Sequence, residues 1–355
     1  MVWCSNGAAC GGMERAAITI ANGLTRRLWE VTLVAPFGHQ AALRRAIESG
    51  VDFVDCEYTR TAAGLYSTQK LIRQLIRDKQ IDAVSAHGSI FPILFCGVPV
   101  VWTEHDVRYE GLAMLAGVRG LPWRRVRDLL LKGRWSLVSV SQFVHEATCA
   151  LLRLPTSSGS VIHNGLPHAE SLNSLDPPSF TPPYRVGYLG RLDPSKRPLE
   201  VFAISRELCR IGLPHVWHVF GDGLLRPEME LLAMRSEHRS VVLRGPVATP
   251  DEALASLDIL CFHSQGAHEG LPTVLLEAAA ANRRVVAWDT AYNREALRGR
   301  GTLVPQPNGL RSFARAIAEA ARAGPEKLPL DQSLTSANMI RAYERLLENA
   351  IGPGK

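Results

Sequence analysis

Two glutamates eight positions apart, Glu269 and Glu277, are the most informative chemical groups in this sequence. Between them Gly270 and Pro272 indicate a turn, and an uninterrupted run of helix-forming residues begins at Thr273. Proline suits the first turn of a helix because its missing N–H would have no partner there. We therefore expect Glu269 in a loop before a helix and Glu277 one turn inside it, with the first backbone N–H groups pointing outward as an anion site.

An acid, a row of amides and a second acid can hold a polyol, a phosphate and a second polyol, which is the order of groups in a sugar nucleotide. The simpler alternative is that Glu269 only balances the helix dipole and Glu277 is a solvated helix residue. Motifs elsewhere in the chain favour the first interpretation.

A second cluster follows the strand that opens at Tyr184. The sequence Y-R-V-G-Y-L-G-R-L-D-P-S-K-R-P predicts a strand that ends at Gly190, with Arg191 and Lys196 in a short loop before a helix. Such cations suit a diphosphate, because arginine offers a bidentate fork and lysine a point charge. As an isolated motif they could equally be solvated loop charges. The next strand, W-H-V-F-G-D-G, ends in a tight glycine turn at Gly221.

The first half of the chain has its own glycine loop. A short strand at residues 2–4 leads to N-G-A-A-C-G-G-M-E-R, and a helix is expected over about 13–28. Gly11 and Gly12 would let the backbone approach a ligand near the mouth of that helix, although a simple turn would use the same residues. The first strand is so short that we expect a weakened sheet edge or a truncated start.

Polar residues follow several further strands of the first half. Ligands collect beyond the carboxyl ends of parallel strands, so these residues are candidates for binding, with a loop or capping role as the alternative. His105 is the strongest, because it lies between two acids and could hydrogen-bond a sugar hydroxyl or orient an acceptor. The set is His87, Glu104, His105, Asp106, Ser141 and Asn164.

Strands and amphipathic helices alternate in both halves, which predicts an α/β chain with doubly wound parallel sheets covered on both faces. A chain of 355 residues fits two domains. Residues 167–183 are rich in proline and turn residues and are expected to be the linker. We expect domains at 1–166 and 184–336, and an amphipathic helix within 337–355.

Composition excludes several classes of protein. The 7 cysteines are scattered singly, which argues against a disulfide framework and a structural zinc site and suits a reducing compartment. The longest apolar run is too short to span a bilayer, and the N-terminus lacks the layout of a signal peptide. We therefore expect a cytoplasmic protein.

The net charge of +6 is concentrated in one segment, from Arg119 to Arg134, in which Asp128 is the only acid. Residues 121–135 can form a helix with an apolar face and a basic face. It could be an ordinary surface helix packed on its sheet, or a contact with an anionic membrane. The sequence contains no recognised nucleic-acid module, so we expect no nucleic-acid partner.

Taken in order, the motifs resemble glycosyltransferase family 4, whose members have the two-domain GT-B architecture. The matching segments are G-G-M-E-R, E-H-D, S-V-S-Q-F, V-I-H-N-G, G-R-L-D-P-S-K-R-P, F-G-D-G and E-G-L-P-T-V-L-L-E-A. The resemblance implies two Rossmann-like domains facing across a cleft, a final helix that returns to the first domain, and a retaining transferase that uses a nucleotide-diphosphate sugar.

The resemblance also assigns residues. Arg191 and Lys196 would hold the departing diphosphate, Glu269 the hydroxyls of the donor sugar and Glu277 the ribose diol. His105 would lie near the donor sugar and, with Arg191, Lys196 and Glu269, form the catalytic set. The remaining donor-binding positions would be Gly11, Gly12, Gly190, Gly221, Gly270, Leu271, Pro272 and Thr273, and the acceptor side would include His87, Glu104 and Asp106. Leu271 and Pro272 depart from the Phe and Gly of many members.

No metal or other cofactor is expected, because the two cations can stabilise the leaving group and no D-x-D motif is placed to bind a metal. The expected acceptor is a glycan or a lipid-linked glycan. A GT-B sugar-nucleotide epimerase, a phosphorylase and a non-catalytic sugar-nucleotide-binding protein remain the alternatives.

Overall fold

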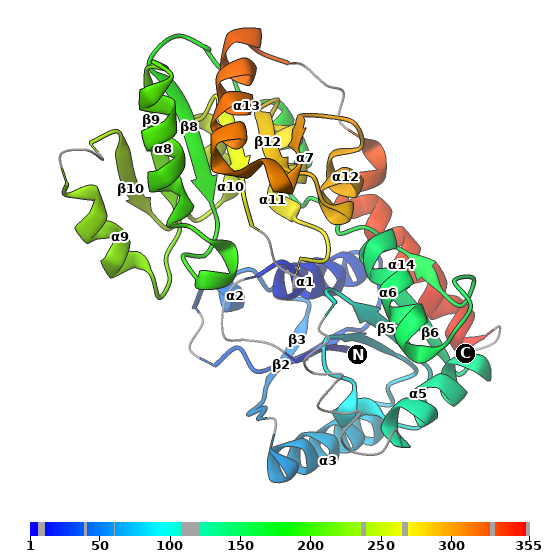
Figure 1. Cartoon of the computed structure of the whole chain (residues 1–355). Helices are drawn as coiled ribbons and strands as arrows, with labels where there is room; N and C mark the ends of the chain where they lie inside the picture. Colours follow the sequence, from blue (N-terminus) through cyan, green and yellow to red (C-terminus); the bar gives the residue numbers. More distant parts are fainter. Residues whose placement is uncertain are drawn as a thin grey trace. The chain divides into compact units, whose positions relative to one another are not determined.

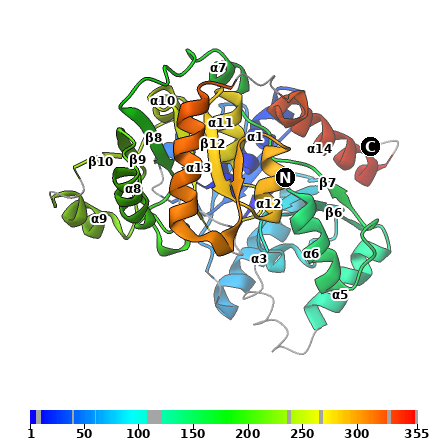
Figure 2. The same ribbon diagram turned by 45° about the horizontal axis from the view of Figure 1, so that its top comes forward.

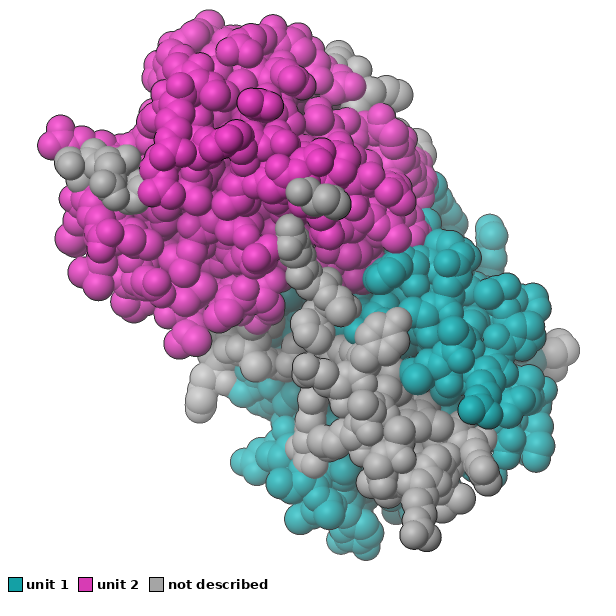
Figure 3. Space-filling view, viewed as in Figure 1, with its two compact units in different colours: residues 1–167, 333–355 teal, residues 168–332 magenta. Residues whose placement is uncertain are grey.

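The computed structural model describes residues 1–5, 11–38, 41–59, 61–107, 121–235, 239–264, 269–326 and 331–352. Within these ranges the side chains of residues 41–42, 121–124, 307 and 332 are not described. The chain forms two compact units, which Figure 3 shows in different colours. Unit 1 comprises Met1–Pro167 and Ser333–Lys355, and unit 2 comprises His168–Gln332. Each unit contains a parallel sheet with helices packed on it (Figures 1 and 2).

The sheet of unit 1 has seven parallel strands in the order β3-β2-β1-β4-β5-β6-β7. They are β1 (Val2–Cys4), β2 (Thr32–Ala35), β3 (Asp52–Asp55), β4 (Val84–His87), β5 (Val100–Glu104), β6 (Trp135–Ser139) and β7 (Ser160–Val161). The expected weakness at an edge was wrong, because the short β1 lies in the middle of the sheet. Trp3 is in register with Val34 on one side and Ala86 on the other.

Alternate residues of these strands enter opposite core layers, as the two-residue period of a strand requires. Val2 and Cys4 pack in one layer with α1 and α14, whereas Trp3 packs in the other with side chains of α3, α5 and α6. The helices of unit 1 are α1 (Gly12–Thr25), α2 (Ala41–Arg45), α3 (Ala62–Asp78), η1 (Phe91–Ile93), α5 (Leu121–Leu131), α6 (Gln142–Leu152) and α14 (Ser336–Ile351).

The final helix α14 belongs to unit 1, as expected. Tyr343 is buried, and its hydroxyl lies 2.9 Å from that of Thr103 in β5. Glu344 accepts hydrogen bonds from Arg27 and from the indole of Trp29. The chain therefore crosses from unit 2 back to the unit in which it began.

Unit 2 contains a sheet of six parallel strands in the order β10-β9-β8-β11-β12-β13. They are β8 (Tyr184–Leu189), β9 (His215–Phe220), β10 (Val241–Gly245), β11 (Ile259–Phe262), β12 (Arg284–Trp288) and β13 (Thr302–Val304). The helices are α7 (Ala169–Asn173), η2 (Pro194–Lys196), α8 (Glu200–Arg210), α9 (Arg226–Ala233), α10 (Pro250–Ala255), α11 (Thr273–Ala280), α12 (Ala291–Leu297), η4 (Gln306–Asn308) and α13 (Gly309–Ala323), and η5 (Gln332–Leu334) leads back to unit 1.

The segment expected to be a linker, residues 167–183, lies almost entirely within unit 2, which begins at His168. Two buried side chains bind its backbone. Arg283 donates to the carbonyl of Asp176 at 2.8 Å, and Asp258 accepts from the amide of Phe180 at 3.4 Å. Composition alone did not reveal this attachment, because the groups that hold the segment come from residues about a hundred positions away.

In both sheets the strand order reverses next to the first strand of the unit. The reversal lies between β1 and β4 in unit 1 and between β8 and β11 in unit 2. Doubly wound sheets bind ligands beyond the carboxyl ends of the strands at such a switch point. The doubly wound α/β fold expected from the sequence is confirmed.

Candidate functional site

The switch point of unit 2 brings together two charged residues that are 73 positions apart in the sequence. Strands β8 and β11 are neighbours, with Val186 in register with Ile259. The loops that follow them are therefore adjacent, and the ammonium of Lys196 forms an ion pair with the carboxylate of Glu269. The hydroxyl of Ser264 donates to the same carboxylate oxygen at 2.8 Å. This contact is the central feature of the candidate site.

Burial excludes the simpler interpretation of Glu277 as a solvated helix residue, and it shows that Glu269 is not an exposed charge. Glu269 is 7% exposed and Glu277 is 8% exposed. The Lys196 side chain keeps 25% of its surface accessible, so the ion pair opens to solvent mainly on the lysine side. Charges in such partly desolvated positions interact more strongly than charges in water.

Arg191 also lies beyond the carboxyl end of β8. Its guanidinium contacts the Asp193 carboxylate at 2.9 Å and is half-exposed, and its carbonyl accepts a hydrogen bond from the Tyr188 hydroxyl at 2.7 Å. Burial raises the pKa of Tyr188, and the nearby carboxylates of Glu269 and Asp193 raise it further. These contacts place both candidate cations in one neighbourhood, each with an acidic partner.

His263 and Ser264, at the end of β11, hold the turn that carries Lys196. The Nε2–H of His263 donates to the carbonyl of Arg197 at 3.1 Å, and the Ser264 hydroxyl lies 3.4 Å from the carbonyl of Ser195. Burial lowers the pKa of His263 to about 4, so the ring is neutral near pH 7. His263, Ser264 and Tyr188 were not among the site residues predicted from the sequence. Their position near the carboxyl ends of two predicted strands was the signal that could have found them.

The candidate glycines of this site serve close backbone packing. Gly190 donates its N–H to the carbonyl of Phe220 at 3.1 Å, which joins the ends of β8 and β9. Gly221 has a φ of +140°, and a Cβ atom there would lie 1.9 Å from the carbonyl oxygen of Gly190. A side chain at position 221 would therefore push the two loops apart.

Helix α11 begins at Thr273, as expected from the sequence, and Pro272 is its N-cap residue instead of part of the first turn. Gly270, Leu271 and Pro272 are buried in the connection from Glu269 to this helix. Residues 265–268, which precede Glu269, lie outside the described ranges. Unit 2 therefore contains the predicted order of Glu269, the amino end of α11 and Glu277.

In unit 1 the structure brings His87 and His105 together. Nδ1 of His87 lies 2.9 Å from Nε2 of His105, and its other ring nitrogen lies 3.2 Å from the Ser85 hydroxyl. His87 is fully buried, and burial lowers its pKa to about 3. His105 is half-buried, as are its neighbours Glu104 and Asp106. His87 therefore contacts the ring of His105 from the protein interior.

Two other candidates of unit 1 have structural partners. The N–H of Gly11 donates to the carboxylate of Glu14 at 3.0 Å, so the first helix supplies an anion of its own at its amino end. Glu14 is 1% exposed and was not selected from the sequence. Ser141 caps α6 by accepting from the amide of Val144 at 3.1 Å, which supports the capping alternative, and Asn164 is buried.

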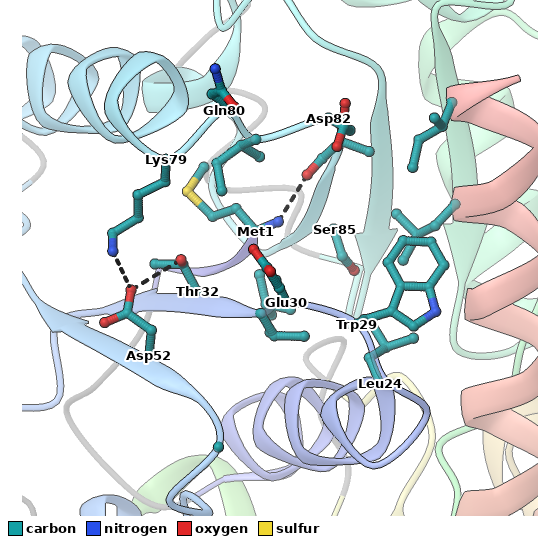
Figure 4. Close-up of a pocket in the computed structure, with 17 residues that line it drawn as sticks. Met1, Leu24, Trp29, Glu30, Thr32, Asp52, Lys79, Gln80, Asp82 and Ser85 are labelled. Carbon is teal, nitrogen blue, oxygen red and sulfur yellow. Dashed lines mark hydrogen bonds and ion pairs between the residues drawn. The ribbon is translucent and has the colours of Figure 1, made fainter. Parts of the chain in front are cut away.

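A cavity of about 460 Å³ lies at the amino ends of the unit 1 strands, the end opposite to the one that carries His87 and His105 (Figure 4). Asp52 binds Lys79 at 3.0 Å and the hydroxyl of Thr32 at 3.0 Å along its wall. None of the residues predicted to bind a ligand lines this cavity. Within the described parts of the chain, no three His, Cys, Asp or Glu side chains are grouped to hold a metal ion.

Comparison with known families identifies the class of protein. Residues 10–170 match Glycosyltransferase Family 4, and residues 183–322 match Glycosyl transferases group 1. The chain belongs to glycosyltransferase family 4 and has the GT-B fold, so the protein is a glycosyltransferase. A search of curated protein sequences gives no significant match.

Solved structures share this fold along nearly the whole chain. A glycosyltransferase from Rickettsia africae has a TM-score of 0.73 at 16% identity, with 99% of each chain covered. Anabaena HepE in complex with UDP has a TM-score of 0.70 at 17% identity, with 98% of each chain covered. The lipopolysaccharide outer core galactosyltransferase WaaB has a TM-score of 0.68 at 13% identity, again with 98% of each chain covered. At these identities the likeness establishes the fold alone.

Two of the buried histidines, His87 and His263, predict a loss of stability in mild acid. The folded-state pKa is about 3 for His87 and about 4 for His263, below the usual value near 6.5 for an unfolded chain. The unfolded chain therefore binds protons that the folded protein does not, and stability falls as pH drops below about 6.5. Each group should cost about 2 kcal/mol at pH 5.

We expect the thermal midpoint of His263→Gln to depend less on pH than that of the wild type between pH 7 and pH 5. The glutamine amide can still donate to the Arg197 carbonyl. His168→Gln, at an exposed position, controls for the change of residue type. Equal pH dependence in His263→Gln and wild type would show that the folded protein protonates His263 as readily as the unfolded chain does.

Proposed function

We propose that the protein transfers a sugar from a nucleoside-diphosphate sugar to a hydroxyl acceptor, and that unit 2 holds the donor. The observation that carries this proposal is the Lys196–Glu269 contact at the switch point of unit 2. A cation that faces solvent, beside a buried carboxylate, offers one group for a diphosphate and another for sugar hydroxyls. Arg191 would provide the second cation, and Glu277 would bind the ribose diol.

In the proposed reaction the bond between the anomeric carbon and the phosphate oxygen breaks, and a bond from that carbon to the acceptor oxygen forms. The acceptor proton passes to the leaving diphosphate, so no protein side chain is needed as a general base. Negative charge develops on the diphosphate, and Lys196 and Arg191 would stabilise it. One such fixed donor typically contributes about 3 kcal/mol to a transition state.

Three further features complete the proposal, of which retention comes from the family resemblance alone. Transfer would retain the anomeric configuration, no metal would be required, and the product would be a polysaccharide or a lipid-linked glycan. Gly11, Gly12 and His105 of unit 1 would also contact the donor, with His87, Glu104 and Asp106 toward the acceptor. HepE has been solved with UDP and with UDP-glucose, so uridine-diphosphate sugars are the first donors to test.

We also propose a cytoplasmic protein that contacts an anionic membrane through the Arg119–Arg134 segment. Residues 119–120 of this segment and the side chains of 121–124 lie outside the described residues. Of the described part, Arg125, Arg127, Lys132 and Arg134 are exposed. None of the described helices has the length and apolar character needed to cross a bilayer.

A screen of nucleotide sugars by thermal shift is the first test. A donor that binds the folded protein at a hundred times its Kd should stabilise it by about 2.7 kcal/mol through mass action. The donor that gives the largest shift is then incubated with the protein, with and without acceptor alcohols. Release of nucleoside diphosphate supports transfer or hydrolysis, whereas an epimerised sugar in the donor-only sample would identify an epimerase. No shift and no turnover with any nucleotide sugar would refute the proposal.

A further inference from the structure

Helix α3 carries a row of exposed side chains on one face. Tyr66, Lys70, Arg73 and Arg77 follow one another at intervals of four, three and four residues, which aligns them along an α-helix. All four are exposed, and Tyr66 is 70% exposed. The only acidic residue of α3, Asp78, lies off this row and accepts a hydrogen bond from Gln74 at 3.2 Å.

The row continues onto a neighbouring turn and helix. The Arg73 guanidinium donates to the carbonyl of Phe95 at 3.1 Å, and the Phe95 side chain is 51% exposed. The guanidinium of Arg125 in α5 lies over the Phe95 ring, 6.0 Å from its centroid. In both ribbon views α3 and α5 lie at the same end of unit 1 (Figures 1 and 2). We name this surface the α3–α5 face; it comprises Tyr66, Lys70, Arg73, Arg77, Phe95 and Arg125.

Several other cations of unit 1 are held in ion pairs. Arg27 pairs with Glu344, Arg44 with Asp55 and Lys79 with Asp52. Within the part of the chain that the structure describes, no carboxylate pairs with any of the four cations of the face. The face therefore presents positive charge together with two exposed aromatic rings, and it is complementary to a negatively charged partner with an apolar component.

We infer that the α3–α5 face docks on a lipid bilayer that carries anionic headgroups. Aromatic side chains favour the boundary between headgroups and acyl chains, and lysine and arginine bind the charged headgroups above it. The row from Tyr66 to Arg77 is about 16 Å long, so α3 can lie flat on the membrane. A nucleic-acid duplex would satisfy the cations but offers no apolar layer for Tyr66 and Phe95.

This inference rests on and deepens the proposed function, since that proposal includes a lipid-linked product and contact with an anionic membrane, and its test requires neither donor nor turnover. The inference also adds a second helix, α3, to the basic segment at 119–134. Loss of vesicle binding and loss of sugar transfer can therefore be observed separately.

The test measures co-sedimentation of the full chain with vesicles of phosphatidylcholine containing phosphatidylglycerol. Each basic residue near an anionic surface should strengthen binding about fivefold. We expect the triple variant Lys70→Gln/Arg73→Gln/Arg77→Gln to bind at least about tenfold more weakly than the wild type. The matched control is Arg311→Gln/Arg315→Gln/Arg322→Gln, which removes three exposed cations from α13 of unit 2 and should bind like the wild type. Circular dichroism and the thermal midpoint establish that both variants are folded.

Two further arms separate the sources of binding. Tyr66→Ser/Phe95→Ser keeps every charge and should weaken vesicle binding at least about threefold, because the rings no longer insert. Vesicles of phosphatidylcholine alone should bind the wild type poorly, and added salt should weaken binding to the anionic vesicles. Equal losses in the α3 and α13 triple variants would overturn the inference, as would tighter binding to a DNA duplex than to anionic vesicles.

Discussion

Replacing Lys196 with alanine should reduce kcat/KM for sugar transfer by about a hundredfold or more. The Lys196 ammonium lies at the switch point of unit 2. Its side chain is 25% exposed, compared with 9% for that of its partner Glu269. If Lys196 stabilises the departing diphosphate, its loss removes stabilisation that is needed most as the glycosyl bond breaks. Both kcat and affinity for the nucleoside diphosphate should fall, because the product carries the same charged group.

Steady-state kinetics with the donor found by the thermal-shift screen measure this effect, and calorimetry measures nucleoside-diphosphate affinity. Lys196→Arg keeps the positive charge and should recover part of the activity. Arg206→Ala removes an exposed cation from α8 of the same unit and controls for the change in net charge. Near-normal turnover in Lys196→Ala would remove Lys196 from the proposed catalytic set.

Glu269→Ala should also reduce transfer about a hundredfold or more, but with a different effect on binding. The carboxylate holds Lys196 in an ion pair, so it competes with the diphosphate for that cation. Removing Glu269 frees the lysine, and affinity for the nucleoside diphosphate should stay the same or increase. The loss should therefore appear in kcat, because Glu269 is proposed to bind the sugar and not the phosphates.

The same calorimetric and kinetic measurements distinguish the two roles. Glu319→Ala, at an exposed position of α13, is the matched control for removing a carboxylate. If Glu269→Ala weakened nucleoside-diphosphate binding as much as Lys196→Ala, Glu269 would act by positioning the lysine and not by binding the sugar. A double variant no slower than either single variant would support that second role, because the two residues would then act as one unit.

The local motifs allowed several features to be predicted from the sequence. The start of α11 at Thr273 followed from the glycine and proline before it, because these residues end a loop and the next ones favour a helix. The alternation of strands and helices predicted the doubly wound sheets, which the strand order confirms. The return of α14 to the first unit was expected from the family resemblance and is also confirmed.

Other features depended on contacts between distant segments. Residues 167–183 were expected to be a linker, but Arg283 and Asp258 hold their backbone within unit 2. The short β1 was expected to indicate a weakened sheet edge or a truncated start, but pairing on both sides makes that strand central. His263 was not predicted, because its role depends on a carbonyl 66 positions earlier in the chain.

The sequence by itself determined the types of charged group available and the loops that carry them, because these depend on residues close together in the chain. Only the tertiary structure decided that Lys196 and Glu269 meet. Their contact requires β8 and β11 to be neighbours at the reversal of strand order, and that pairing is set by packing of the whole sheet. The burial that makes Glu269 and Glu277 more than surface charges has the same origin, because it depends on what the rest of unit 2 packs around them.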